Sequence, residues 1–599
     1  MGGHSLLAMR SIDRIYNQFG SSISMVEFFA NPCLYQQAAL LERQASGNAP
    51  QEIYPARLGH EEAPLSFTQE RLWVLGQLDE ASIAYNIVGG IEITGNLDMN
   101  CINVALRDVV KRHRIMRSYY VMTDDGLKQR FNDDVDELVV EQVDYSDRPA
   151  GDAELAADEL IRRISREAFD LARYPLFRLV AIQIAPRRAQ LVGVFQHIIF
   201  DGWSARLFVN ELQKRYREAQ LGISNTLPAP AIEFADYAAW QRDQFESKGA
   251  SNKHLAYWLE KLQGDPTLLR LPYDRPRPMQ PNYDGDSIIR FLPSDLTRRI
   301  KNLARSQDAS VFMLLLAAFK VLLFRYSGER EITVGSPVAG RRTKELEELI
   351  GCFINTLPLR TELDGDQKFL DVLSRRGADG VIPLFQTLLV FQNFELPTFG
   401  VPGLGVEPLS LANGGAQFEL SLFMAEQDGR IQVVLQYNSN LFDETTAERI
   451  FEHYSTLLNH VTHFPLAIVN QTPVLPEAER SMILREWNRA NDEAIEADTL
   501  PQLFESSIKA NARRIAVENR GQSVTYRELD KRAKSIAATL VRHGIKPGEL
   551  VGISMQRGPD MVASILGIHR AGAAYLPLDP GFPASRLDYM ISDSGTRLV

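Results

Sequence analysis

The 599-residue sequence predicts a multidomain α/β protein. A chain of this length is too long for a single hydrophobic core, so we expect three or more domains. Apolar residues make up 45% and charged residues 24% of the chain, as in ordinary globular domains. Stretches with apolar residues at helical spacing alternate with short apolar runs typical of strands, which indicates helices layered on sheets.

The composition excludes several classes of protein. The formal net charge of −11 is spread without a long run of one sign, so we expect no nucleic-acid partner. Cys33, Cys101 and Cys352 lie far apart, which favours neither a disulfide framework nor a metal site. The apolar stretch at 311–324 is shorter than the ~20 residues that span a bilayer and contains Lys320, so it predicts a core helix. No secretory signal is recognisable, and we expect a cytoplasmic protein without a membrane partner.

The first elements are helical and are followed by a linker and a long α/β region. Residues 5–43 have apolar side chains at helical spacing, and the stretch at 44–64 is polar and rich in Pro, Gly and Ala. The region from 65 to about 476 predicts helices and strands in alternation, including helices at 102–113 and 298–305 and strands at 191–199, 331–338, 386–393 and 431–438.

The last elements form a connection and a smaller α/β segment. Residues 474–498 are charged and helical in their middle, and the order from Thr499 onward is helix, strand, helix, strand. Gly and Pro residues at 571–583 predict turns. The chain opens directly on a helix and stops in a strand-like run at 589–599, so we expect both ends to be cut from a longer protein.

The first motif is "GGHSL", with Ser5 at the start of a helix. Two glycines allow a tight turn, and the ordinary interpretation of the serine is a helix cap. The wider pattern, "GGHSLLAMRSIDRI" followed by "ISMVEFFANPCLYQQAALLE", resembles the second half of a peptidyl carrier domain. The resemblance implies that 4′-phosphopantetheine is attached to Ser5 and carries an aminoacyl or peptidyl thioester. The first helix of that domain is missing here, which leaves attachment in this chain open.

The second motif is "FQHIIFDGW" at 195–203. A lone histidine in an apolar strand is usually a hydrogen-bonded core residue. In its context the segment resembles the HHxxxDG motif of the condensation domains of non-ribosomal peptide synthetases. Four further segments resemble that family in the expected order: "LSFTQERLWVLGQL" at 65–78, "KRHRIMRSYY" at 111–120, "EFADYAAW" at 233–240 and "IGCFINTLPLR" at 350–360. The resemblance implies two lobes, both like chloramphenicol acetyltransferase, that face each other across a tunnel.

The resemblance also implies the roles of the motif residues. Amide formation requires an amine to lose a proton while it attacks a thioester, and an imidazole with a pKa near ~6.5 can accept or share that proton. We therefore expect His197 to be catalytic, either as a general base or by orienting the amine, and Gly202 to let the backbone turn and approach substrate where a Cβ would obstruct. Asp201 is expected to be structural and to pair with Arg341. Gln196 replaces the first motif histidine and can also donate and accept hydrogen bonds.

One segment departs from the family. Between "KFLDVLSRR" and "PLFQTLLVFQN" the family has a helical stretch with an HQDxPFE-like motif, and here only "GADGVI" at 377–382 intervenes. This deletion and Gln196 favour an alternative function, a degenerate condensation domain that docks carrier proteins without forming bonds. A free-standing acyltransferase that uses coenzyme A is a second alternative, which the flanking segments disfavour.

The third motif region lies at the C-terminal end. Residues 523–557 and 566–595 resemble the beginning of an adenylation domain, which activates an amino acid with ATP and Mg²⁺. The family's phosphate loop and amino-acid pocket are absent from this sequence, so ATP and Mg²⁺ would serve only the complete domain. We expect no amino-acid activation by this chain.

These resemblances predict a carrier remnant, a condensation domain and the start of an adenylation domain. The predicted partners are an upstream donor carrier, a downstream acceptor carrier, a phosphopantetheinyl transferase and aminoacyl or peptidyl thioester substrates. The predicted bounds are 1–45 for the carrier part, 46–62 for a linker, 63–475 for the condensation domain (lobes at about 63–230 and 231–475), 476–497 for a second linker and 498–599 for the adenylation part.

Overall fold

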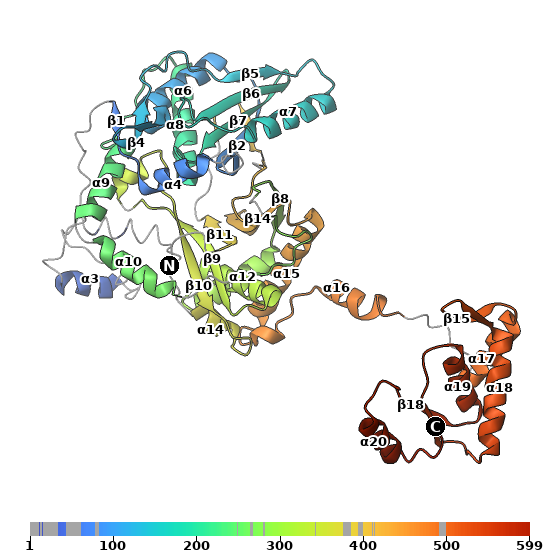
Figure 1. Ribbon diagram of the computed structural model, residues 1–599. Helices are drawn as coiled ribbons and strands as arrows, with labels where there is room; N and C mark the ends of the chain where they lie inside the picture. The colour runs from blue at the N-terminus through green and yellow to red at the C-terminus, as the bar shows by residue number, and fades with distance from the viewer. Residues whose placement is uncertain are drawn as a thin grey trace. The chain divides into compact units, whose positions relative to one another are not determined.

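The protein is described by a computed structural model that covers residues 11, 15, 34–43, 61–77, 83–247, 250–263, 268–278, 282–341, 343–374, 385–392, 399–409, 411, 414–489 and 499–599. The chain divides into two compact units, Met1–Arg480 and Ser481–Val599 (Figure 1). Of the helical segment predicted at 5–43, the structure describes α3 (Leu34–Arg43) and the isolated helical residues Ser11 and Ile15.

The first lobe of the large unit is built from the segments up to residue 247. Its elements are β1 (Glu62–Ala63), α4 (Phe67–Gly76), β2 (Asn86–Thr94), α6 (Met99–Arg112), η1 (Arg114–Arg117), β3 (Ser118–Thr123), β4 (Gly126–Phe131), β5 (Glu141–Asp144), α7 (Ala150–Ser165), β6 (Phe177–Ala185), β7 (Arg188–Gln196), α8 (Gly202–Gln220) and α9 (Phe234–Ser247). β2, β7 and β6 pair antiparallel, β5 joins β6 in parallel, and β1, β4 and β3 form a separate antiparallel sheet. α7 packs on β6 and β7, and α6 packs on α8.

The second lobe follows from residue 250. Its elements are α10 (Ala250–Lys261), β8 (Gly285–Phe291), α11 (Ser294–Ser306), α12 (Val311–Ser327), β9 (Glu331–Val338), α13 (Lys344–Glu347), β10 (Asn355–Glu362), α14 (Phe369–Ser374), β11 (Thr387–Gln392), β12 (Gly405–Pro408), β13 (Leu420–Gln427), β14 (Arg430–Asn438), α15 (Glu444–His463), η2 (Val469–Gln471) and α16 (Glu477–Ser481). The sheet order is β10, β9, β11, β13, β14, β8, with β11 parallel to both of its neighbours. α11, α12 and α15 pack together against this sheet.

The core of the second lobe explains why its central helix forms. Ser310 caps the start of α12 by accepting a hydrogen bond from the N–H of Met313, and Gly328 ends the helix in the left-handed conformation with φ of 71°. All residues from Leu314 to Phe324 are buried, so the predicted core helix is confirmed. This run includes Lys320, whose Nζ donates to Oγ1 of Thr361 at 2.6 Å.

The two lobes are interlocked by segments that cross from the second to the first. β12 pairs antiparallel with β2, so Gly405 lies opposite Thr94 in the first lobe's sheet. Side chains from 346–353 and 399–401 belong to the hydrophobic core of the first lobe. The two lobes are therefore not two separate halves of the chain, because residues from the second half complete the hydrophobic core of the first lobe.

The C-terminal unit is a smaller α/β arrangement. Its elements are a π-helical turn (Met482–Glu486), α17 (Leu500–Asn511), β15 (Ile515–Asn519), β16 (Gln522–Thr525), α18 (Tyr526–Arg542), β17 (Leu550–Ile553), α19 (Pro559–Arg570), β18 (Ala574–Pro577) and α20 (Ala584–Ser594). The expected single strand before α18 is instead the antiparallel pair β15 and β16, because Arg520 and Gly521 both have positive φ and close a two-residue hairpin. β17 and β18 are parallel.

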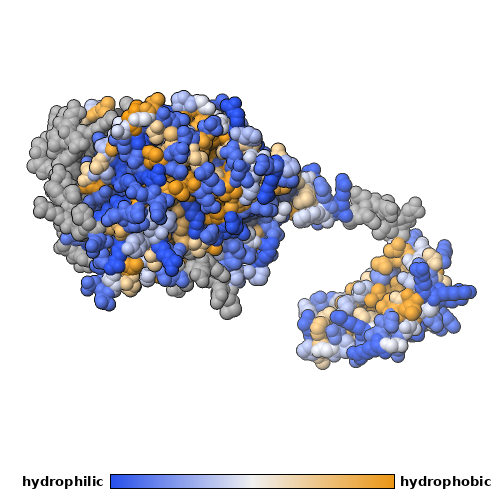
Figure 2. All heavy atoms as spheres, turned by 90° about the horizontal axis from the view of Figure 1, so that it is seen from above, coloured by the Kyte–Doolittle hydropathy of each residue, from blue (hydrophilic) through white to orange (hydrophobic). Residues whose placement is uncertain are grey.

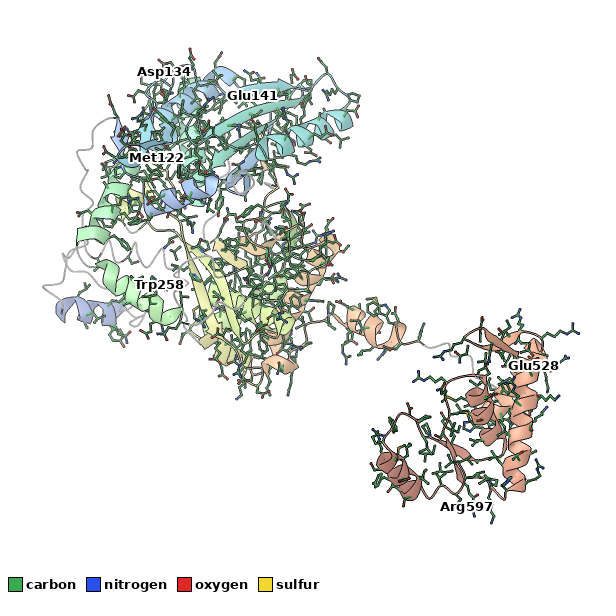
Figure 3. The ribbon with its side chains drawn as sticks, in the orientation of Figure 1. Met122, Asp134, Glu141, Trp258, Glu528 and Arg597 are labelled. Carbon is green, nitrogen blue, oxygen red and sulfur yellow. The ribbon has the colours of Figure 1, made fainter. Side chains whose placement is uncertain are left out.

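Figure 3 labels two residues of the C-terminal unit, Glu528 on α18 and Arg597. Glu528 caps α18 by accepting from Thr525, and Arg597 forms an ion pair with Glu549 at 3.0 Å. Figure 2 shows polar and apolar side chains interspersed on the visible surface of each unit. Within the described residues no single helix is long and apolar enough to cross a membrane, although α11 and α12 together pass that test across a 106° bend.

Candidate active site where the two lobes meet

His197 lies in the turn that connects β7 to α8. The apolar run around it predicts a strand through the histidine, but β7 ends at Gln196 because the chain turns there. The N–H of Phe200 donates to the carbonyl of His197 at 3.2 Å, and the N–H of His197 donates to the carbonyl of Tyr85 at 2.9 Å. Residues 198–200 are buried, whereas His197 is partly exposed. His197 is therefore the partly solvent-accessible residue of an otherwise buried apolar segment at 195–200.

Gln196 makes the local hydrogen bonds that hold this turn. Its backbone N–H donates to the carbonyl of Leu176 at 3.0 Å, and its side-chain Oε1 accepts from the N–H of Ile198 at 2.7 Å. The residue is 1% exposed, so an unpaired N–H at Ile198 would be costly here. At the position of the first motif histidine, the glutamine side chain therefore accepts a hydrogen bond from the backbone of the turn.

Asp201 forms a buried ion pair with Arg341 across the two lobes. Nη1 and Nη2 of Arg341 donate to the two carboxylate oxygens at 2.6 and 3.0 Å, and the Asp201 side chain is 0% exposed. Burial by itself raises the pKa of Asp201, but the charge and hydrogen bonds of Arg341, together with Ser204, hold that pKa below its ordinary value. The carboxylate is therefore ionised at cellular pH.

The same carboxylate organises the backbone around it. Asp201 caps α8 by accepting from the N–H of Ser204 at 2.8 Å. It also accepts from the N–H of Phe353 at 3.1 Å, and Oγ of Ser204 accepts from the N–H of Gly351 at 3.0 Å. Arg341 lies 4.1 Å from the centre of the Phe353 ring. One pair of charges thus joins the start of α8 to the loop that precedes β10.

Gly202 is the first residue of α8. Its backbone has no positive φ, so its conformation does not by itself require glycine. A Cβ built at Gly202 would meet no atom within 4 Å. The missing side chain therefore leaves open space one residue from Asp201, which is consistent with close approach of a ligand.

The imidazole of His197 is in a setting that keeps it neutral. Desolvation by burial lowers the pKa of His197 from its ordinary 6.5, the Arg71 guanidinium lowers it further, and Asp201 and nearby backbone carbonyls act in the opposite direction. Nδ1 lies 3.5 Å from Sγ of Cys352, and the Tyr85 ring centre lies 6.4 Å from the imidazole centre. A neutral imidazole at cellular pH can accept a proton from an attacking amine.

Three further residues around Asp201 and His197 are not indicated by the motifs themselves. Cys352 and Arg71 lie inside segments that resemble the family, but their proximity to His197 depends on packing between distant segments. Ser204 was within reach of sequence reasoning, because an aspartate three residues before a helical serine is a common capping arrangement.

Two predicted features lie outside the described residues. Ser5, the expected attachment residue, is one of them, so no chemistry is derived through it. The shortened segment at 377–382 is the other; the structure describes α14 before it and β11 after it.

Two interlocked α/β lobes with a partly exposed imidazole where they meet define a two-lobed acyltransferase fold. The chain belongs to the condensation domain family, whose model matches residues 60–381 and 375–484 and thus more than half of the chain. The two matched segments meet at 375–381, where the family's helical stretch is expected to be missing. A phosphopantetheine attachment site model matches 1–41, and an AMP-binding enzyme model matches 504–599. The carrier match implies covalent 4′-phosphopantetheine, and the adenylation match covers only part of such a domain.

The curated relatives are large peptide synthetases. Tyrocidine synthase 3 of Brevibacillus parabrevis is 33% identical over 624 residues, and surfactin synthase subunit 1 of Bacillus subtilis (strain 168) is 31% identical over 624. These matches cover 100% of this chain but only 9% and 17% of the relatives, so the chain spans less than a fifth of their length. The predicted resemblance to a non-ribosomal peptide synthetase, with three segments in this order, is confirmed.

Solved structures show the same fold. A four-domain nonribosomal peptide synthetase, holo-AB3403 bound to AMP and glycine, matches with a TM-score of 0.75 and 24% identity over 92% of this chain and 44% of that one. The X-domain from teicoplanin biosynthesis matches with a TM-score of 0.62 and 22% identity over 71% of this chain and 100% of that one. The first condensation domain of the calcium-dependent antibiotic synthetase, in complex with a substrate analogue, matches at 0.57 and 19% over 69% and 99%. The predicted fold class is confirmed.

Proposed function

We propose that the large unit catalyses amide formation between a donor aminoacyl or peptidyl thioester and the amine of an acceptor aminoacyl thioester. Both substrates would be held on phosphopantetheine arms of carrier domains. The observation that carries the proposal is the partly exposed His197 imidazole, kept neutral where the interlocked lobes meet. Membership of the condensation domain family supports it.

The reaction assigns a role to each site residue. The acceptor nitrogen attacks the thioester carbonyl carbon, a C–N bond forms, and the C–S bond breaks to release the donor arm as a thiol. His197 is proposed as the catalytic residue that takes or shares the proton lost by the nitrogen. Gly202 is proposed to leave room for substrate, while Asp201 and Arg341 hold the loop beside the imidazole.

The remaining assignments extend this proposal to the flanking segments. Ser5 is proposed as the attachment residue of the carrier part at 1–45, loaded by a phosphopantetheinyl transferase. The condensation domain is proposed to span 63–475 and the adenylation part 498–599, with linkers between them. Donor and acceptor carriers are the proposed protein partners, and the cytoplasm is the proposed location, without nucleic-acid or membrane partners.

The alternative of a non-catalytic docking domain gains no support from the site. Gln196 makes the hydrogen bond that the turn needs, and the pair of Asp201 with Arg341 is intact. No observation on the described residues points to loss of the chemistry.

The test is a condensation assay with the full chain. Separate donor and acceptor carriers are loaded with L-aminoacyl groups from a panel of aminoacyl-coenzyme A compounds, and the dipeptidyl thioester is followed by mass spectrometry. We expect His197→Ala to slow product formation roughly 10²–10⁴-fold, the usual contribution of general acid–base catalysis. His463→Ala, at an exposed histidine of the same unit, is the matched control and should condense at the parent rate. Equal rates for the parent and His197→Ala would refute the catalytic role.

A further inference from the structure

Cys352 lies against the imidazole of His197 and is fixed there from both sides. Its Sγ is 3.5 Å from Nδ1 of the histidine. The preceding Gly351 donates its N–H to Oγ of Ser204, and the following Phe353 donates its N–H to Oδ2 of Asp201. The thiol is 1% exposed, so it is a closed wall of the imidazole's surroundings.

We propose that Cys352 is a positioning residue for the condensation reaction, because its thiol occupies the Nδ1 side of the His197 ring and directs the Nε2 edge toward the reacting amine. This inference rests on the proposed function of His197. The thiol contacts Nδ1 and not Nε2, so Nε2 is assigned to the reacting amine. A ring free to rotate about its side-chain bonds would present either nitrogen.

The chemistry of a thiol suits this position. Burial raises the pKa of Cys352 well above its ordinary value, so the group stays a neutral S–H at cellular pH. A neutral thiol is a weak donor and a weak acceptor, and it can therefore contact the ring without adding a charge beside it. A small apolar group in this place also keeps water away from Nδ1.

The contact between Cys352 and His197 depends on the buried ion pair of Asp201 with Arg341. Arg341 and Asp201 hold the loop that carries Cys352, and the loop comes from the part of the chain that builds the second lobe. His197 comes from the first lobe. The orientation of the imidazole thus depends on the seating of a second-lobe segment in the first lobe's core.

The groups that face the imidazole determine how its protonation responds to Cys352. They are the backbone carbonyls of His197 and Phe200, the carboxylate of Asp201, the guanidinium of Arg71 on α4, the phenol ring of Tyr85 and the thiol itself. Removing the thiol admits water beside the ring, which stabilises the imidazolium. The pKa of His197 is then expected to rise toward its ordinary value.

The test compares Cys352→Ala, Cys352→Ser and Cys101→Ala in the full chain. Cys101 is half-buried on α6, away from the site, and makes Cys101→Ala the matched control. With the loaded carriers described above, Cys352→Ala should lower kcat about tenfold with little change in KM, because a misdirected imidazole still allows binding. The acidic limb of its pH–rate profile should move to higher pH. Cys352→Ser keeps a donor and an acceptor of similar size and should restore most of the rate.

A second readout does not depend on condensation. Histidine labelled with ¹⁵N reports the tautomer and pKa of each imidazole, and His197 is assigned from the signal missing in His197→Ala. A tautomer and pKa in Cys352→Ala equal to those of the parent and of Cys101→Ala would overturn the positioning role. If the tautomer changes and the pKa rises in Cys352→Ala while His197→Ala still condenses at the parent rate, the positioning of the ring by Cys352 is supported. The same result would refute the proposed function of His197.

Discussion

Replacing Asp201 with alanine should destabilise the large unit severely. The change leaves Arg341, whose side chain is 2% exposed, as a buried charge without its partner, and such a loss costs roughly 3–5 kcal/mol. For unfolding of a unit the size of the first lobe, within the range of roughly 150–250 residues, 1 kcal/mol corresponds to a Tm change of roughly 2–4 °C, so we expect a drop of roughly 6–20 °C. Differential scanning calorimetry of the full chain measures this shift.

The control is an exposed ion pair in the same lobe. Asp136 pairs with Lys111 at 2.9 Å, but 83% and 53% of their side chains are exposed, so Asp136→Ala should leave the Tm close to the parent's. In a double-mutant cycle, adding Arg341→Met to Asp201→Ala should recover part of the loss, because no unpaired charge is then buried.

The pH dependence follows from the lowered pKa of Asp201. A depressed carboxyl pKa contributes stability that is present above the unfolded value of about 3.9 and is lost as pH falls below it. The difference between parent and Asp201→Ala should therefore stay constant from about pH 5 to 8. If the Tm of Asp201→Ala stays within about 2 °C of the parent's across that range, the loss of stability is on the order of 1 kcal/mol or less. That result would refute the structural role of Asp201.

Two further predictions concern buried polar groups. Lys320→Met should stabilise the second lobe by on the order of 2–4 kcal/mol at pH 7, because burial lowers the pKa of Lys320 to about 7 and the amine has only Thr361 as a hydrogen-bond partner among the described residues. The stabilisation by Lys320→Met should shrink as pH rises from 7 toward 10, because the unfolded chain then also loses the proton. Urea unfolding at both pH values checks this, and an equal stabilisation at both would contradict it. Gln196→Leu should cost about 1–3 kcal/mol by leaving the N–H of Ile198 unpaired, whereas Gln196→His should cost less; equal Tm values for the two variants would argue against the hydrogen bond.

Motif order in the sequence identifies the segment around His197, and apolar runs predict the buried helix at 311–324 and the strand at 331–338, which the structure forms as β9. These features depend on local periodicity and on residues close together in the chain. The apolar run predicts a strand that includes His197, but the strand ends one residue earlier, because the backbone turns through hydrogen bonds to Tyr85 and from Phe200. An apolar run does not reveal where its backbone leaves the sheet.

The order of the segments, the α/β class and the residues able to carry proton transfer can be predicted from the sequence, since periodicity and motif order depend on neighbouring positions. Three features follow from packing and not from the sequence pattern: Cys352 reaches His197, β12 joins the sheet of the first lobe, and a Cβ at Gly202 would meet open space. Cys352 and His197 are 155 residues apart, and such a contact arises when whole elements pack to bury apolar surface. No local pattern in either segment encodes the other's position.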